Sequence, residues 1–170
     1  MFMPAKSTVT GVRVMGLAVA ILPNKRPALR TVVVDDAGGA PTVAECFDIP
    51  ASDEPLAAQL HSLARAADSR ARSAGQIHRV VVRRADVPPR ASNAEGPKLR
   101  LLAEGAVIAA VRDVVPAVDV GTGKDIGRWH GSNKQGADGA ASAVLAPAGR
   151  DSKYVDAAAA ALAGLALGPP

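Results

Sequence analysis

The chain has 170 residues, a length typical of one domain of roughly 100–200 residues. Apolar residues make up 48% of it but aromatic residues only 2%, so the core must be built mainly from alanine, valine and leucine. A single cysteine excludes a disulfide framework and a cysteine-rich zinc site, and no apolar stretch reaches the roughly 20 uninterrupted residues of a membrane span. We therefore expect a soluble cytoplasmic protein without membrane contact, with one domain over 8–167 and tails at 1–7 and 168–170.

The formal net charge of +4 makes a polyanion such as nucleic acid a candidate partner. A GC-rich genome, which enriches arginine and alanine together, is the alternative explanation of this balance. The placement of the charges adds information, because segment 35–53 is acidic and the cations gather elsewhere. Nucleic acid would therefore contact two basic segments, which contain Arg79, Arg83, Arg84, Arg90, Lys98 and Arg100 in the first, and Lys124, Arg128 and Lys134 in the second.

The N-terminal third predicts three antiparallel strands. Residues 8–22 are rich in β-branched and apolar side chains, 29–35 contain a run of valines, and 42–49 alternate inward and outward. The Pro/Asn/Lys-rich stretch 23–27 and the Gly-rich stretch 36–41 separate them as turns. These three strands form a meander.

A helix is predicted next, with Ser52 as its N-cap and an acidic first turn. Its apolar side chains recur at helical spacing and Gly75 ends it. Residues 77–82 predict a short buried strand, and 85–98 a loop. A second helix follows and ends near Pro116; Gly105 in its middle is unfavourable unless another helix packs closely there.

The remainder predicts a brief strand at 118–120, a Gly-rich loop at 121–136, and helices at 137–145 and 154–167. Three antiparallel strands followed by alternating helices and strands indicate an α/β protein with a mixed sheet flanked by helices. Its last two strands would be parallel. This is the order of the RNase H-like fold, with a ferredoxin-like or doubly wound variant left open.

Several stretches resemble RuvC-type Holliday-junction resolvases. PKLRLLAEGAVIAAVRD (97–113) resembles the interface helix of that family and follows a strand, VVVRRAD, where the family places an acid. The segment VDVGTGKDIGRWHGSNKQGADGAASAVL is similar to the family's strand and Lys-rich turn, and KYVDAAAAALAGLAL to its last helix. The resemblance covers about residues 10–167 and implies the same RNase H-like fold.

The resemblance also implies where catalytic acids would stand. DNA-cutting members use about four carboxylates to hold two Mg²⁺ ions, which stabilise the attacking and leaving oxygens. The first acid belongs at the end of the first strand, but residues 14–18 contain none. The second falls near Arg83 or Arg84, just before Asp86, and of the last helix's two acids only Asp156 remains, with Lys153 three residues earlier.

We therefore expect a RuvC-like protein with weak or lost nuclease activity and no metal cofactor, a pseudonuclease. It would hold the phosphates of branched or structured DNA, although the sequence does not distinguish DNA from RNA, through Arg83, Arg84, Arg90, Lys98, Lys124, Arg128, Lys134 and Lys153. The first alternative is a Mg²⁺-dependent, resolvase-like endonuclease with a site rebuilt from Asp35, Asp36, Asp86 and Asp156. The second is a scaffold protein on the same fold that binds no nucleic acid.

The helix 97–113 presents a broader apolar surface than one helix of a small domain needs. A homodimer, which the resemblance also implies, would cover it through Leu99, Leu102, Ala103, Ala106, Val107 and Ala110. A purely internal core helix is the alternative.

Three further features have ordinary interpretations. The Gly-Thr-Gly-Lys-Asp run at 121–125 lacks the spacing of a phosphate loop and predicts a flexible turn. Trp129 either stacks on an unpaired base or anchors its loop to the core. Cys46 is expected to be a buried apolar residue, and His61 and His78 to be neither ligands nor catalytic groups.

Overall fold

A computed structural model describes residues 11–86 and 95–170 of the chain. The tail 1–7 and Arg90 lie outside the described residues. One five-stranded sheet has the order β3-β2-β1-β4-β5. β1 pairs antiparallel with β2 and β2 with β3, whereas β4 runs parallel to β1 and to β5. The mixed sheet is confirmed, and its strands are β1 (Val12–Ile21), β2 (Pro27–Asp36), β3 (Thr42–Pro50), β4 (Arg79–Arg83) and β5 (Val118–Gly121).

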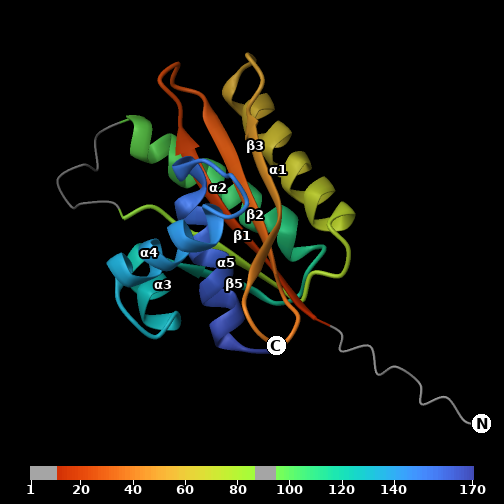
Figure 1. Cartoon of the computed structure of the whole chain (residues 1–170). Coiled ribbons are helices and arrows are strands. Elements are labelled where there is room, and N and C mark those ends of the chain that lie inside the picture. The colour runs from red at the N-terminus through yellow and green to blue at the C-terminus, as the bar shows by residue number, and fades with distance from the viewer. Residues whose placement is uncertain (1–10, 87–94) are drawn as a thin grey trace, which may run out of the picture.

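Helices cover both faces of this sheet (Figure 1). On one face lie α1 (Leu56–Ser73) and α2 (Glu95–Arg112); on the other lie α3 (Gly123–Trp129), α4 (Lys134–Leu145) and α5 (Val155–Leu167). A short 3₁₀ helix, η2 (Ser152–Tyr154), leads into α5. The layers are those of the RNase H-like fold.

The alternation of side chains along the strands divides the core in two. Met15, Leu17 and Val19 of β1 point toward α1 and α2, whereas Val14 and Ala18 point toward α5. The strands therefore read as nearly continuous apolar runs, because both faces of the sheet are covered.

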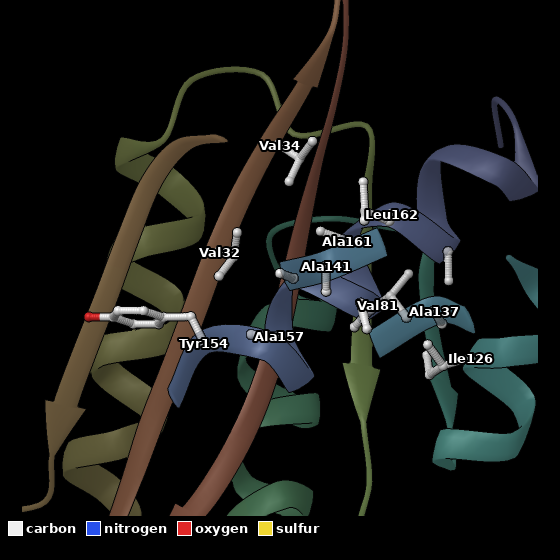
Figure 2. Packing of buried hydrophobic residues seen from close by; sticks show 14 of the residues in the cluster. Val32, Val34, Val81, Ile126, Ala137, Ala141, Tyr154, Ala157, Ala161 and Leu162 are labelled. Atoms are coloured by element: carbon white, nitrogen blue, oxygen red, sulfur yellow. The ribbon is translucent and has the colours of Figure 1, made fainter. Parts of the chain in front are cut away.

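The alanine-rich helix α5 lies unusually close to β1. A Cβ atom built on Gly16 would be 1.8 Å from the carbonyl oxygen of Ala157, and one on Gly164 would be 2.6 Å from a methyl of Val14. Residues 157–163 are all buried, and Figure 2 shows their small side chains against the valines of the sheet. Close approach therefore explains why this core uses alanine and glycine rather than aromatic rings. Among the described helices, α5 included, none is long and apolar enough to cross a bilayer.

The predicted N-cap at Ser52 is wrong. The chain still runs along β2 at this point, because the N–H of Ala51 donates to the carbonyl of Pro27 at 2.9 Å. The helix begins only at Leu56, Pro55 occupies the cap without a side-chain hydrogen bond, and no acid lies in the first turn. The helix ends at Ser73 with Ala74 as its C-cap, immediately before Gly75, which was predicted to end it.

The predicted Gly-rich loop at 121–136 is also wrong, since it contains α3. Thr122 and Asp125 form a capping box: the Thr122 N–H donates to the Asp125 carboxylate at 2.9 Å, and the Thr122 hydroxyl accepts from the Asp125 N–H. Gly127 allows the next turn to pass closely, since a Cβ there would lie 2.2 Å from the backbone of Asn133. The 121–125 run is thus a helix start rather than a flexible turn.

Candidate functional site

One line of paired residues crosses all five strands at the carboxyl end of β1. From one edge to the other it contains Asp48, Arg30, Ala18, Arg83 and Gly121. Ala18 belongs to the core cluster under α5, and residues in register share a face, so the two arginines flank Ala18 on the side that α5 covers. We call these five positions the central row.

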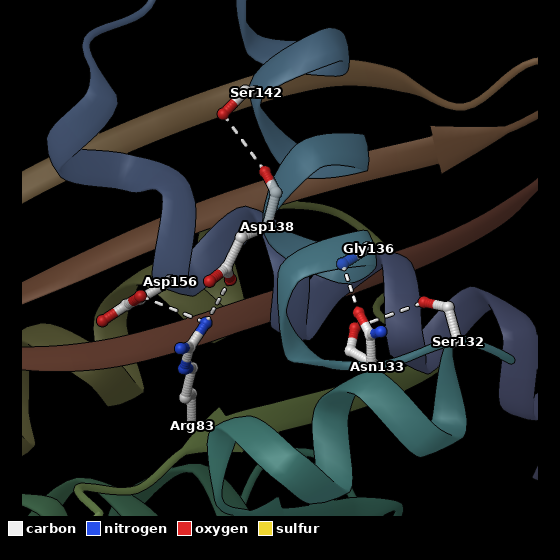
Figure 3. Close-up of polar contacts among 7 residues, drawn as sticks. All are labelled: Arg83, Ser132, Asn133, Gly136, Asp138, Ser142 and Asp156. Carbon is white, nitrogen blue, oxygen red and sulfur yellow. Dashed lines mark hydrogen bonds and ion pairs between the residues drawn. The ribbon is translucent and has the colours of Figure 1, made fainter.

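Arg83 is buried, and its charge is balanced by two carboxylates. Its Nη1 atom lies 2.8 Å from Oδ1 of Asp138 on α4 and 3.1 Å from Oδ1 of Asp156 on α5. Figure 3 shows the guanidinium between the two acids. The group therefore ties the end of β4 to both helices, and charge-assisted hydrogen bonds of this kind are among the stronger ones.

Lys153 and Arg30 meet at Asp48 at the other end of the row. The Lys153 Nζ lies 2.9 Å from Oδ2 of Asp48, and this contact raises the pKa of Lys153. The Nε of Arg30 lies 3.6 Å from the other carboxylate oxygen. Three cations and three carboxylates thus form two clusters along the central row. Asp48 lies between Arg30 and Lys153 in one, and Arg83 lies between Asp138 and Asp156 in the other.

Other cations lie at this same edge of the sheet with their charges exposed. Arg84 and Lys124 follow the carboxyl ends of the adjacent parallel strands β4 and β5, and the Arg84 N–H donates to the carbonyl of Gly121 at 2.9 Å. The carbons of the Lys134 side chain pass beside Gly123. Within 11–86 and 95–170, the ion pairs include none of Arg84, Lys124 and Lys134.

Solved structures with the same fold were found by comparison. No family model matches the chain, and no curated protein does. Thermus thermophilus RuvC in complex with a Holliday junction substrate has a TM-score of 0.66 at 17% identity, over 91% of this chain and 93% of that chain. A second Thermus thermophilus RuvC structure has a TM-score of 0.65 at 17% identity, over 91% of this chain and 94% of that chain. The chain has a RuvC-like fold.

The RuvC-like fold brings together the positions that the sequence resemblance marked for acids. Ala18 stands near the end of the first strand beside Arg83 of β4, and Asp156 at the start of α5 contacts Arg83. Lys153 in η2 contacts Asp48, which lies in the same row two strands from Ala18. Asp156 is the one acid among the four marked positions. Asp138 on α4 adds a carboxylate that the sequence resemblance had not indicated.

These residues do not fit a pair of Mg²⁺ ions. Mg²⁺ needs oxygen ligands with nearly octahedral geometry, and the carboxylates of Asp138 and Asp156 already share the Arg83 guanidinium. Across the described part of the chain, no three His, Cys, Asp or Glu side chains are grouped to hold a metal ion.

The alternative acidic site is not assembled either. Asp35 and Asp36 pair with Arg13 and Val12 at the start of β1, five or more residues from Ala18 and thus about 16 Å away along the strand. Asp35 is held there by Arg13 at 2.6 Å, a contact that raises the pKa of Arg13. Asp86 is exposed just beyond β4.

The other predicted phosphate contacts differ in their availability. Arg83 is only 5% exposed, so its guanidinium is not presented to a ligand. Lys153 is exposed but paired with Asp48. Arg128 and Lys98 are exposed with one acidic neighbour each, Asp125 at 3.1 Å and Glu95 at 3.7 Å.

Trp129 anchors its segment to the core, the second of the two sequence interpretations. Its ring packs against the α5-side cluster and against Gly121, where an added Cβ would be 2.7 Å from the ring. Cys46 is half-buried against the same cluster, and burial raises the pKa of its thiol. His61 is exposed, and His78 precedes β4 and accepts the Arg13 N–H at 3.1 Å.

The apolar surface of α2 is divided between the core and solvent. Ala103 and Val107 are fully buried within the monomer, so they cannot serve a dimer contact as predicted. Leu99, Ala106 and Ala110 are half-buried, whereas Leu102 is 52% exposed. No helix of the described chain packs at Gly105, where an added Cβ would meet open space.

Glu104 is a buried acid that the sequence reasoning missed. Its side chain is 3% exposed, and Oε1 accepts hydrogen bonds from the Ala85 N–H at 2.8 Å and from Arg100 at 2.9 Å. Oε2 is buried without a partner among the described residues, and burial raises the pKa of the carboxyl. The sequence feature that could have identified Glu104 is its position beside Ala103 and Val107 on the apolar face of the helix, which is buried.

Proposed function

We propose that this protein binds branched DNA through its phosphates and does not cut it. The single observation that carries the proposal is the Arg83 guanidinium shared by Asp138 and Asp156, in place of a group of acids open to metal ions. The fold supports the DNA part, because one structure with this fold is RuvC in complex with a Holliday junction substrate.

The balance of charges at the central row gives the physical reason. A nuclease of the two-metal type needs Mg²⁺ both to bring phosphate next to its acids and to stabilise the in-line displacement. Here three side-chain cations offset three carboxylates, so phosphate can approach without a metal. These side-chain cations are held in ion pairs and, unlike Mg²⁺, cannot coordinate the water that would attack the phosphate. Binding is therefore independent of Mg²⁺, and cleavage has no catalyst.

The contact surface consists of Arg84, Lys124 and Lys134, with Arg128 and Lys98 at its margins. Contacts of this type fix the protein on the sugar–phosphate backbone and carry no sequence information by themselves. Recognition would consequently depend on the shape of the DNA rather than on its sequence.

We also propose that a second copy packs on the outer face of α2. Leu101 is 42% exposed, and Gly105 and Ala109 follow it at four-residue spacing on the same exposed face. A glycine inside a helix is unfavourable unless a close neighbour exploits it, and no neighbour within the described chain does. The homodimer would thus use residues next to those first predicted.

The test is anisotropy of a labelled four-way junction titrated with the full-length protein, in EDTA and in Mg²⁺, at several salt concentrations. We expect the same affinity with either additive and a steep loss as salt rises, because binding releases counterions from the phosphates. No measurable binding would support the scaffold alternative. Binding only in Mg²⁺, with product formation, would support the nuclease alternative.

A further inference from the structure

An apolar groove of about 570 Å³ opens between the β1–β2 turn and the first turns of α1 and α2. Figure 1 shows the start of α2 beside that turn. Its walls are Ile21, Leu56, Leu99 and Leu102, and its rim carries Lys25, Glu95 and Lys98. Leu56 is 47% and Leu102 is 52% exposed, and large apolar side chains gathered in a concave surface indicate a binding site.

Lys25 is held at the rim by a rigid turn. Its φ of +65° is unusual for a residue with a side chain, and its N–H donates to the carbonyl of Leu22 at 2.8 Å. The N–H of Leu22 donates in turn to the carbonyl of Arg26 at 2.9 Å. Among the ion pairs of the described chain Lys25 has no partner, whereas Lys98 faces Glu95 at 3.7 Å. The rim therefore carries a net positive charge above an apolar floor.

The groove and the proposed DNA surface lie at the same edge of the sheet. Ile21 is the last residue of β1, three residues or about 10 Å beyond Ala18, and strand alternation places its side chain on the α1 and α2 side. Arg84 follows the carboxyl end of β4, the parallel neighbour of β1. DNA bound at Arg84 would therefore lie at the edge of the sheet where the groove opens.

We propose that this groove binds an unpaired nucleotide of the bound DNA, with the base against the leucines and its phosphate at Lys25. The proposal rests on the DNA-binding function proposed above. An unpaired nucleotide has a base with two apolar faces to bury and a phosphate that needs a cation. The groove offers apolar walls for the base and Lys25 for the phosphate within one site. Aliphatic walls would replace the aromatic platform common in single-strand binding, because Trp129 is packed into the core.

The experiment compares two four-way junctions that differ only by one bulged 2-aminopurine nucleotide at the branch. We expect the wild-type protein to bind the bulged junction several-fold more tightly. The 2-aminopurine emission should rise on binding, since the base leaves its stacked neighbours. Leu56→Asn and Leu102→Asn each place a polar group at an exposed position and should abolish the preference and the emission change.

Two further variants make the assay specific. Lys25→Asn removes the charge but tolerates a positive φ, and should weaken binding of the bulged junction more than of the paired one. Leu167→Asn alters another exposed leucine, 37% exposed at the far end of α5, and should change nothing.

Equal affinity of the wild-type protein for both junctions, with salt-dependent binding intact, would overturn this inference and leave the proposed function standing. Failure to bind either junction would remove both proposals. Loss of self-association in Leu56→Asn, with the bulge preference retained, would assign the groove to a second copy instead.

Discussion

The Nη1 atom of Arg83 lies 3.1 Å from Oδ1 of Asp156, so the last helix of this RuvC-like fold is tied to β4 by an ion pair. Oδ1 of Asp138 on α4 lies 2.8 Å from the same Nη1 atom. The sequence resemblance places an acid near Arg83 or Arg84. The charge at this position is therefore opposite to the one that metal-dependent cleavage needs, and the helices are held by side chains instead.

The two sides of this ion pair should contribute unequally to stability. Asp138→Asn with Asp156→Asn leaves a buried guanidinium without a counter-charge, and we expect a loss of about 2 kcal/mol, below the usual range because both acids are partly exposed. Arg83→Met leaves two partly solvated carboxylates and should cost less, about 1 kcal/mol. Urea unfolding of both variants measures the difference. Greater destabilisation by Arg83→Met would mean that the guanidinium is not desolvated as described.

The exposed cations should set the salt dependence of DNA binding. Lys134→Ala and Arg84→Ala should each weaken binding to every junction sequence alike and reduce the slope of log K against log salt by about 1. Arg65→Ala removes an exposed arginine from α1, remote from the carboxyl edge, and serves as the matched control. Unchanged slopes in the first two variants would place the DNA elsewhere on the protein.

Glu104 should make stability depend on pH in a direction opposite to that of an ordinary surface acid. Its pKa in the folded protein is raised by burial above the value of about 4.3 in an unfolded chain. Between these two values the folded state holds the extra proton, so the contribution of Glu104 to stability falls as pH rises.

Glu104→Gln, which keeps an acceptor for the Ala85 N–H, should remove this slope. The measurement is the urea midpoint of wild type and variant from pH 4 to 7. We expect the wild type to lose stability relative to the variant as pH increases. A relative gain would show that Arg100 and Arg84 outweigh the burial of the carboxyl.

The proposed dimer depends on close approach at Gly105. Gly105→Leu fills open space in the monomer and should leave its stability unchanged or slightly higher, while separating the two copies of α2. Leu101→Arg should act in the same way through charge. Sedimentation at several concentrations distinguishes monomer from dimer. A dimer that persists in both variants would place the interface on another surface.

The strands could be predicted because their signals are local. Valine runs and turn residues mark β1 to β5, and Gly75 marks the end of α1. The missed helix α3 also had a local signal, since Thr122 and Asp125 have the spacing of a capping box, but the surrounding glycines suggested a loop. The wrong N-cap at Ser52 could not be avoided from local sequence, because the hydrogen bond from Ala51 to Pro27 depends on the pairing of β2 and β3.

The candidate site was predictable only in part. The resemblance marked Arg83, Lys153 and Asp156, and the fold brings these positions together. Whether a strand-end arginine is buried or exposed depends on its long-range partners, and Asp138 lies 55 residues along the chain from Arg83. The sequence therefore suggested phosphate contacts where the structure shows internal ion pairs.

Incubation of a labelled four-way junction with the full-length protein in Mg²⁺, followed on a denaturing gel, tests the central claim most directly. The same mixtures, run on a native gel, report binding. We expect a shifted complex with intact strands, both in Mg²⁺ and in EDTA. Cleavage that requires Mg²⁺ and disappears in Asp156→Asn would contradict the account, because it would show that the acids beside Arg83 hold catalytic metal ions.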